Sequence, residues 1–170
     1  MKRRWRWLGW VLVILGSLAV AGISISGYLF SRWSEVLPAD SAGAEAAFRD
    51  ARERAGGGPA YVEILPTGQV RVRRELEGTE RRPFASLHLL AWDPEAARLV
   101  RIAFPFWFVR MKMNDAVNLG TITTALAGDW RHLDLRVSVR DLERRGPGIV
   151  LDHEMDDGSR VLLWTSPPGA

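Results

Sequence analysis

The chain has 170 residues, no cysteine and a formal net charge of +3. Without cysteine it has no disulfide, no thiolate metal site and no cysteine nucleophile. Five of the 23 basic residues but none of the 20 acidic ones lie in residues 1–33, so the remaining chain is slightly acidic. The high pI therefore comes from the N-terminal end, and the composition argues against a nucleic-acid-binding role.

The longest apolar stretch is residues 8–30, which contain no acidic or basic side chain. As a helix, this stretch would reach roughly 35 Å, enough to cross a hydrocarbon core of about 30 Å. Four basic residues precede it and only Arg32 follows closely, which favours an N-terminus in the cytoplasm. We therefore predict a cytoplasmic tail (1–7), a transmembrane helix (8–30) in the inner (plasma) membrane, and a periplasmic or extracellular C-terminal domain. The expected membrane-interface anchors are Trp5, Trp7, Trp10, Tyr28 and Trp33.

A cleaved signal peptide is the alternative interpretation of the same stretch. Ala19, Val20 and Ala21 form a signal-peptidase-like site after an apolar segment. The apolar run continues for nine residues beyond Ala21, which is longer than secretion requires. The extra length favours an uncleaved anchor, and both interpretations send the following domain out of the cytoplasm.

The region after the anchor is predicted to begin with a polar tether (31–43). Small residues and Phe48 recur at helical spacing over residues 44–55, which predicts an amphipathic helix capped by Asp40 or Ser41. Alternating residues at 60–65 and 69–76, separated by a turn containing Gly68, predict a β-hairpin.

A second pair of strands is expected at residues 84–92 and 99–104, joined by a turn with Pro94 at its second position. Residues 106–113 are apolar nearly all round, which predicts a buried helix. Residues 114–128 favour helix weakly, and residues 132–137 alternate like a strand.

The C-terminal part combines a capped helix with a third hairpin. Ser138 and Asp141 form a variant capping box that opens a helix ending near Arg145. Residues 149–155 and 160–165 are predicted to pair across an Asp-Asp-Gly turn, and residues 166–170 form a flexible tail.

Taken together, these elements predict an α+β fold. It would consist of one transmembrane helix followed by a small ectodomain (44–165) of antiparallel hairpins packed on two or three helices. The ectodomain divides naturally into two lobes, 44–83 and 84–165.

The turn of the third hairpin carries the richest set of polar side chains. Its carboxylates are weak candidates for a metal site: Asp152, Glu154, Asp156 and Asp157. On a strand, however, Asp152 and Glu154 point to one face and His153 to the other, so the set does not converge. The spacing fits no EF-hand or zinc motif. We therefore predict no metal, no cofactor and no catalytic residue.

An aromatic cluster offers a second type of site. It comprises Phe104, Phe106, Trp107 and Phe108. A domain of this size needs large side chains in its core, so burial is the favoured interpretation. The alternative is a surface that contacts a protein partner or the lipid bilayer.

Three segments carry a resemblance to known proteins: residues 92–110, 139–142 and 148–164. They resemble uncharacterised bacterial single-pass membrane (envelope) proteins, and also a small module at the end of some envelope-associated proteins. The shared features are structural: a strand, a proline and an apolar helix, then an acidic hairpin tip. The resemblance implies a bacterial envelope protein and transfers no catalytic residue.

The sequence thus favours a bitopic membrane protein whose extracytoplasmic domain acts by binding, as an adaptor, sensor or assembly subunit. Its expected partners are the lipid bilayer and an envelope protein, with the oligomeric state unspecified. One alternative is an envelope hydrolase or metal-dependent enzyme that combines the acidic tip with His88 or His132. The others are a membrane-apposed domain using residues 104–113 and a secreted protein with a cleaved signal.

Overall fold

The computed structural model describes residues 33–112, 117–118 and 136–168. The chain divides into two compact units, Met1–Ser34 and Glu35–Ala170, and the fold below belongs to the second. The predicted tail (1–7), membrane span (8–30) and helix over 114–128 lie outside the described residues, as do Trp5, Trp7, Trp10 and Tyr28. Trp33 is described and half-buried.

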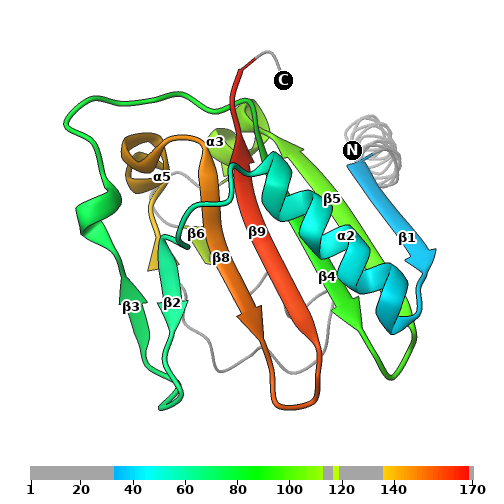
Figure 1. Cartoon of the computed structure of the whole chain (residues 1–170). Coiled ribbons are helices and arrows are strands. Elements are labelled where there is room, and N and C mark those ends of the chain that lie inside the picture. Colours follow the sequence, from blue (N-terminus) through cyan, green and yellow to red (C-terminus); the bar gives the residue numbers. More distant parts are fainter. Residues whose placement is uncertain (1–32, 113–116, 119–135, 169–170) are drawn as a thin grey trace, which may run out of the picture. The chain divides into compact units, whose positions relative to one another are not determined.

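A seven-stranded mixed sheet dominates the second unit (Figure 1), in the order β1-β5-β4-β9-β8-β2-β3. Its strands are β1 (Ser34–Pro38), β2 (Val62–Ile64), β3 (Val70–Val72), β4 (Ser86–Asp93), β5 (Arg98–Pro105), β8 (Gly148–Glu154) and β9 (Arg160–Ser166). The pairs β4–β5, β4–β9, β8–β9 and β2–β3 are antiparallel. The pair β2–β8 is parallel and joins the first hairpin to the rest of the sheet.

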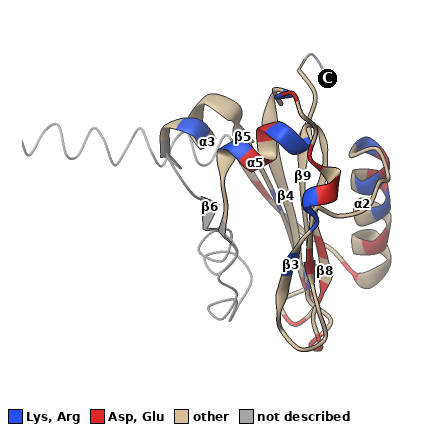
Figure 2. Cartoon of the chain, turned by 90° about the vertical axis from the view of Figure 1, so that its left-hand side faces the viewer, with Lys and Arg blue, Asp and Glu red and all other residues tan. Residues whose placement is uncertain are grey.

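Helices cover both faces of this sheet (Figure 2). Helix α2 (Ser41–Arg54) lies on one face. The other face carries α3 (Phe106–Lys112), α5 (Val139–Arg145) and a small sheet of β6 (Val117–Asn118) with β7 (Arg136–Val137). A short 3₁₀ turn, η1 (Arg74–Leu76), follows β3.

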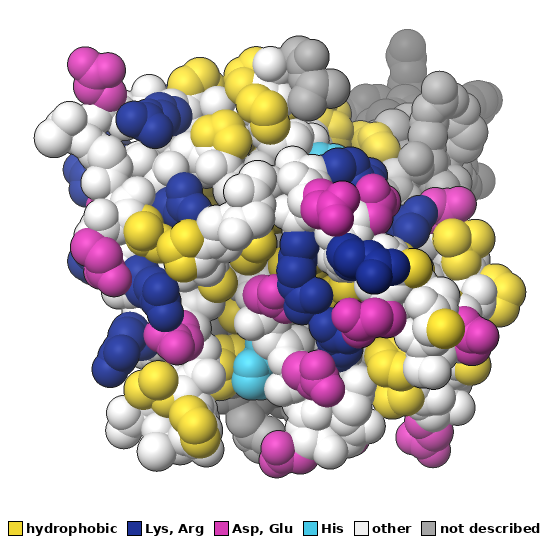
Figure 3. All heavy atoms as spheres, viewed as in Figure 1, with side chains coloured by type: hydrophobic (Ala, Val, Ile, Leu, Met, Phe, Trp, Pro, Cys, Tyr) yellow, Lys and Arg dark blue, Asp and Glu magenta, His cyan; other side chains and the backbone are white. Residues whose placement is uncertain are grey.

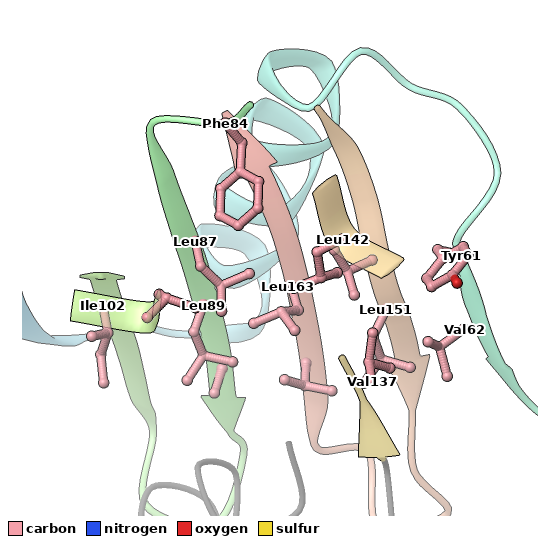
Figure 4. Packing of buried hydrophobic residues seen from close by; sticks show 14 of the residues in the cluster. Tyr61, Val62, Phe84, Leu87, Leu89, Ile102, Val137, Leu142, Leu151 and Leu163 are labelled. Atoms are coloured by element: carbon pink, nitrogen blue, oxygen red, sulfur yellow. The ribbon is translucent and has the colours of Figure 1, made fainter. Parts of the chain in front are cut away.

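Successive side chains of a strand point to opposite faces of the sheet, so the sheet has a separate hydrophobic core on each face. On β4, Leu87, Leu89 and Ala91 join the larger core, which also holds Tyr61, Leu142 and Leu163 (Figure 4). Leu90 on the same strand joins the smaller core beneath α2. The sheet is therefore buried on both faces over its central strands.

Helix α2 forms as its sequence predicts. The Asp40 carboxylate accepts a hydrogen bond from the Gly43 N–H at 2.7 Å, so Asp40 is the N-cap. The small-residue stripe of α2 faces the sheet, and Phe48 is fully buried as its one large residue. Short side chains let the helix lie close to the strands beneath it.

The three predicted hairpins and the capped helix are confirmed. Gly68 and Gly158 have φ of 76° and 80° in their turns, a region that glycine enters without steric cost. At Ser138 the capping box is complete. Its side chain accepts from the Asp141 N–H at 3.0 Å, and its own N–H donates to the Asp141 carboxylate at 3.3 Å.

The predicted fold class is wrong. The hairpins do not pack as separate units on helices; they share strand edges in one mixed sheet, which contains strands from both predicted lobes. Hydrogen bonding explains the difference, because an edge strand gains partners when a neighbouring hairpin pairs with it. No helix within residues 33–112, 117–118 and 136–168 is long and apolar enough to cross a membrane. The predicted span itself lies outside those residues.

Three local predictions also need correction. Part of the tether forms the edge strand β1, and Ser166 of the flexible tail ends β9. Helix α3 is less buried than expected. Val109 is fully buried, but Trp107 and Met111 are 55% and 60% exposed. A seven-residue helix against a sheet covers one side only, so its opposite side remains outside the core.

Candidate functional site

The acidic residues of the third hairpin separate as the strand geometry predicts. Asp152 faces α2 and accepts two hydrogen bonds from Arg52, at 2.6 Å (Nε) and 2.9 Å (Nη2). Glu154, two residues on, lies 3.3 Å from the Arg160 guanidinium. His153 lies opposite Val161, a residue of the core on the other side of the sheet.

Arg160 links this region to α2. Its guanidinium binds the Glu45 carboxylate and lies 4.7 Å from the centre of the Phe48 ring. The hydrogen bond from Arg160 lowers the pKa of Glu45. Basic and acidic side chains alternate over this face of the domain (Figure 3), which leaves only a weak net field.

Two of the four candidate metal ligands are therefore paired with arginine side chains. Asp152 and Glu154 each face a guanidinium instead of one another. Within the described residues, no group of three or more histidine or carboxylate side chains is placed to hold a metal ion. The arrangement suits a structural charge network better than a cation site.

A cavity of about 450 Å³ opens at the end of the sheet, between the turns of the first and third hairpins. We call it the hairpin groove. Its lining residues are Ile64, Leu65, Pro66, Gly68, His153, Glu154, Met155, Asp156 and Asp157. Its size falls within the range of about 300–1,000 Å³ that is typical of ligand sites.

The groove exists because β2 and β8 separate. Within the described residues, the register joins them at one pair, Val62 with Leu151, and the Tyr61 N–H donates to the Ile149 carbonyl at 3.0 Å. Beyond that point each strand runs into its own hairpin turn (Figure 1). The opening is therefore a split in the sheet.

Both turns that border the groove are fixed by their own hydrogen bonds. In the first, the Leu65 N–H donates to the Gln69 carbonyl at 2.9 Å. In the third, the Met155 N–H donates to the Ser159 carbonyl, and the Ser159 N–H to the Asp157 carboxylate, both at 2.8 Å. The groove is thus largely preformed.

The groove combines an apolar lining with negative charge. Ile64, Leu65, Pro66 and Met155 supply the apolar surface, whereas Glu154, Asp156 and Asp157 are exposed carboxylates. Burial lowers the pKa of His153, and the charges of Asp156 and Asp152 oppose that shift. A ligand with a cationic group beside an apolar one would match both features.

A second polar cluster lies at the start of β4, on the face of the sheet that carries α2. The Ser86 hydroxyl is 2.8 Å from His88 Nε2 and 2.8 Å from the Ser166 hydroxyl, which is itself 3.2 Å from His88 Nε2. The imidazole stacks on Trp164 with ring centres 4.9 Å apart. Burial is the main cause that lowers the pKa of His88, and the positive charge of Arg54 lowers it further.

Hydroxyls in contact with a neutral imidazole satisfy one requirement of a serine nucleophile. The other requirements are an orienting carboxylate, an oxyanion site and room for substrate. Within the described residues, no carboxylate is hydrogen-bonded to His88, and none of the three residues lines the hairpin groove. The cluster is best explained as mutual satisfaction of half-buried polar groups at the sheet end.

The aromatic candidates divide between the core and the surface. Phe106 packs edge-on against the buried Phe84 at 4.5 Å, and Phe104 stacks on Phe108 at 5.9 Å. Trp107 packs edge-on against Phe108, with ring centres 5.9 Å apart, and is itself exposed. Of the four, Trp107 is the most exposed.

The sequence indicated the acidic turn beside the groove only as a weak metal candidate, and it indicated nothing of the serine–histidine cluster. Ser86 and His88 are two residues apart on a strand, so their shared face was predictable from alternation. Ser166 joins them only through the register of β4 with β9, and the β2–β3 turn meets the acidic turn only through the β2–β8 pairing. These long-range pairings have no local signal.

No family model, no curated protein and no solved structure matches the chain.

Proposed function

We propose that the chain acts by binding a protein partner in the cell envelope, with the hairpin groove as the contact site. The observation that carries the proposal is the groove itself: a preformed opening between two fixed turns, apolar inside and acidic at its border. Such a site suits an extended segment that places a lysine or arginine beside an apolar side chain.

Asp156 is the residue most available to such a partner. It is exposed, and no ion pair to it occurs among the described residues. Glu154, in contrast, is near Arg160, and Asp157 accepts a hydrogen bond within its own turn. A basic side chain of the partner would therefore meet Asp156 first.

An extracytoplasmic location is part of the same proposal. It is supported by the apolar residues 8–30 and the four basic residues before them. An anchored form and a cleaved, secreted form would both present the groove outside the cytoplasm. A reporter enzyme that folds only there, fused after Ala170, should be active; activity solely of a cytoplasmic reporter would contradict the location.

The enzymatic alternative lacks comparable support. Asp152 is bound by Arg52 and His88 by two serines, so neither is directed at a shared substrate position. His132 lies outside the described residues.

Partner capture with matched variants tests the proposal. The full-length chain is crosslinked in cells, extracted with mild detergent and purified, as wild type and as Asp156→Arg. The control is Glu53→Arg, which reverses an exposed charge on α2, away from the groove. We expect the same partner with wild type and control, and at least a tenfold loss with Asp156→Arg, equivalent to about 1.4 kcal/mol.

Binding of synthetic peptides gives a direct reading of the same site. Peptides with an arginine beside a leucine should bind the full-length chain, whereas versions with glutamate in place of arginine should not. Equal capture of the partner by wild type and Asp156→Arg, with both folded by circular dichroism, would exclude the hairpin groove as the contact site.

A further inference from the structure

Arg145, at the C-terminal end of α5, has an incomplete set of partners. Its Nη1 and Nη2 groups donate to the carbonyls of Pro147 and Pro59 at 3.5 and 3.4 Å, both long for such bonds. Its Nε–H is buried and has no hydrogen-bond partner among the residues that the structure describes. A buried donor without an acceptor is destabilising, so this guanidinium is poorly satisfied by the described part of the chain.

A second arginine increases the imbalance. Burial lowers the pKa of Arg145, and the charge of Arg82 lowers it further, so the two cations are close enough to repel. Within the described residues, neither of them forms an ion pair with a carboxylate. Their sequence neighbours differ: Arg81 is 3.9 Å from Glu143, and Arg144 is 3.7 Å from Glu77. The carboxylates of Glu143 and Glu77 thus pair with Arg81 and Arg144.

The segment Gly146-Pro147-Gly148 makes room for both side chains. Gly146 has φ of 74°, and a Cβ there would lie 2.9 Å from Cβ of Arg82. Gly148 has φ of 145°, and a Cβ there would lie 2.8 Å from Nη2 of Arg145. Each glycine therefore allows one arginine to lie against the backbone, and Gly146 also ends α5.

We propose that Arg82 and Arg145 together bind a phosphate group. Two uncompensated guanidinium groups favour an anion that can accept several charge-assisted hydrogen bonds, and the oxygens of a phosphate match the fork of donors on arginine. The same chemistry is offered by free phosphate esters and by the headgroups of anionic lipids. The site is at the start of β8, whereas the hairpin groove is at its other end, so this proposal does not depend on the proposed function.

Calorimetric titration of the full-length chain in a non-ionic detergent tests the site with three probes at constant ionic strength. These are inorganic phosphate, glycerol 3-phosphate and the phosphodiester glycerophosphoglycerol. Binding of inorganic phosphate or glycerol 3-phosphate alone would assign a free phosphate ligand. Preference for the diester would assign a lipid headgroup. Either result supports the proposal if the double variant Arg82→Gln/Arg145→Gln weakens binding at least tenfold.

The matched control is Arg81→Gln/Arg144→Gln, which removes the same charge from the neighbouring, ion-paired residues and should leave the affinity within twofold of wild type. Arg145→Lys should bind with intermediate affinity, since it keeps the charge but loses the fork. If no probe binds the folded wild type at millimolar concentration, or if both double variants lose affinity equally, Arg145 acts only as a structural cap of α5 and the proposal is overturned.

Discussion

Arg52 and Asp152, one hundred residues apart, are joined by two parallel hydrogen bonds of 2.6 and 2.9 Å between α2 and β8. Both side chains are only about a third exposed, at 32% and 27%. The hydrogen bond that Arg52 donates to Asp152 raises the pKa of Arg52. We expect Asp152→Asn to lower the free energy of unfolding by about 1–2 kcal/mol, because it weakens a charge-assisted pair. Urea denaturation followed by circular dichroism measures the loss.

The control for this pair is Asp50→Asn on the same helix. Asp50 pairs with Arg54, but both side chains are about 60% exposed, so solvent screens the interaction. Its loss should cost under about 0.5 kcal/mol. Equal effects of the two substitutions would contradict a special role for the Arg52–Asp152 pair.

Phe48 is the one large apolar side chain that α2 packs against the sheet, and it is fully buried, with a relative exposure of 0%. Phe48→Ala should therefore lower the free energy of unfolding by about 3–5 kcal/mol. Phe48→Leu should lose less, since most of the volume remains. Urea denaturation of both variants tests the order, and equal stability of Phe48→Ala and wild type would contradict the packing.

The sequence predicts local structure well in this chain because the relevant signals are local. Asp40 and Ser138 identify helix starts, and Gly68 and Gly158 identify tight turns. The parallel pairing of Val62 with Leu151 joins strands separated by most of the domain, and no residue near either strand indicates it. The predicted fold class failed at that step, because it left the hairpins separate.

The candidate sites show the same contrast between local sequence signals and long-range strand pairing. Alternation correctly separated Asp152 from His153 on β8. The groove forms because the β2–β8 pairing brings Ile64 and Asp156 together. The arginine pair needed Arg82 and Arg145 to share one glycine-containing segment. Sites assembled across the sheet are therefore the ones that sequence patterns do not reveal.

The capping box of α5 should be important for its stability because the helix has only two turns. Ser138→Ala removes the acceptor for the Asp141 N–H and should lower the free energy of unfolding by about 1 kcal/mol. Ser138→Thr keeps a hydroxyl and should lie within a few tenths of wild type. Hydrogen exchange of the Asp141 amide measures the local effect, and unchanged protection in Ser138→Ala would contradict the role of the cap.

His88 should make the fold sensitive to mild acid. Burial and the charge of Arg54 lower the pKa of His88 below its ordinary value of 6.5. The unfolded chain therefore binds a proton more readily than the folded chain, so the free energy of unfolding should fall as the pH drops below about 6.5. The loss should level off below the folded-state pKa.

Comparison of unfolding in urea at pH 8 and pH 5.5 tests the role of His88, with the change between the two pH values as the readout. The pKa of His153 is also lowered, so His88→Gln should reduce this change and His88→Gln/His153→Gln should reduce it further. The comparison within each variant cancels any loss of stacking on Trp164, which is independent of pH once the imidazole is gone. A pH dependence in His88→Gln as steep as that of wild type would show that other groups, and not this imidazole, control acid stability.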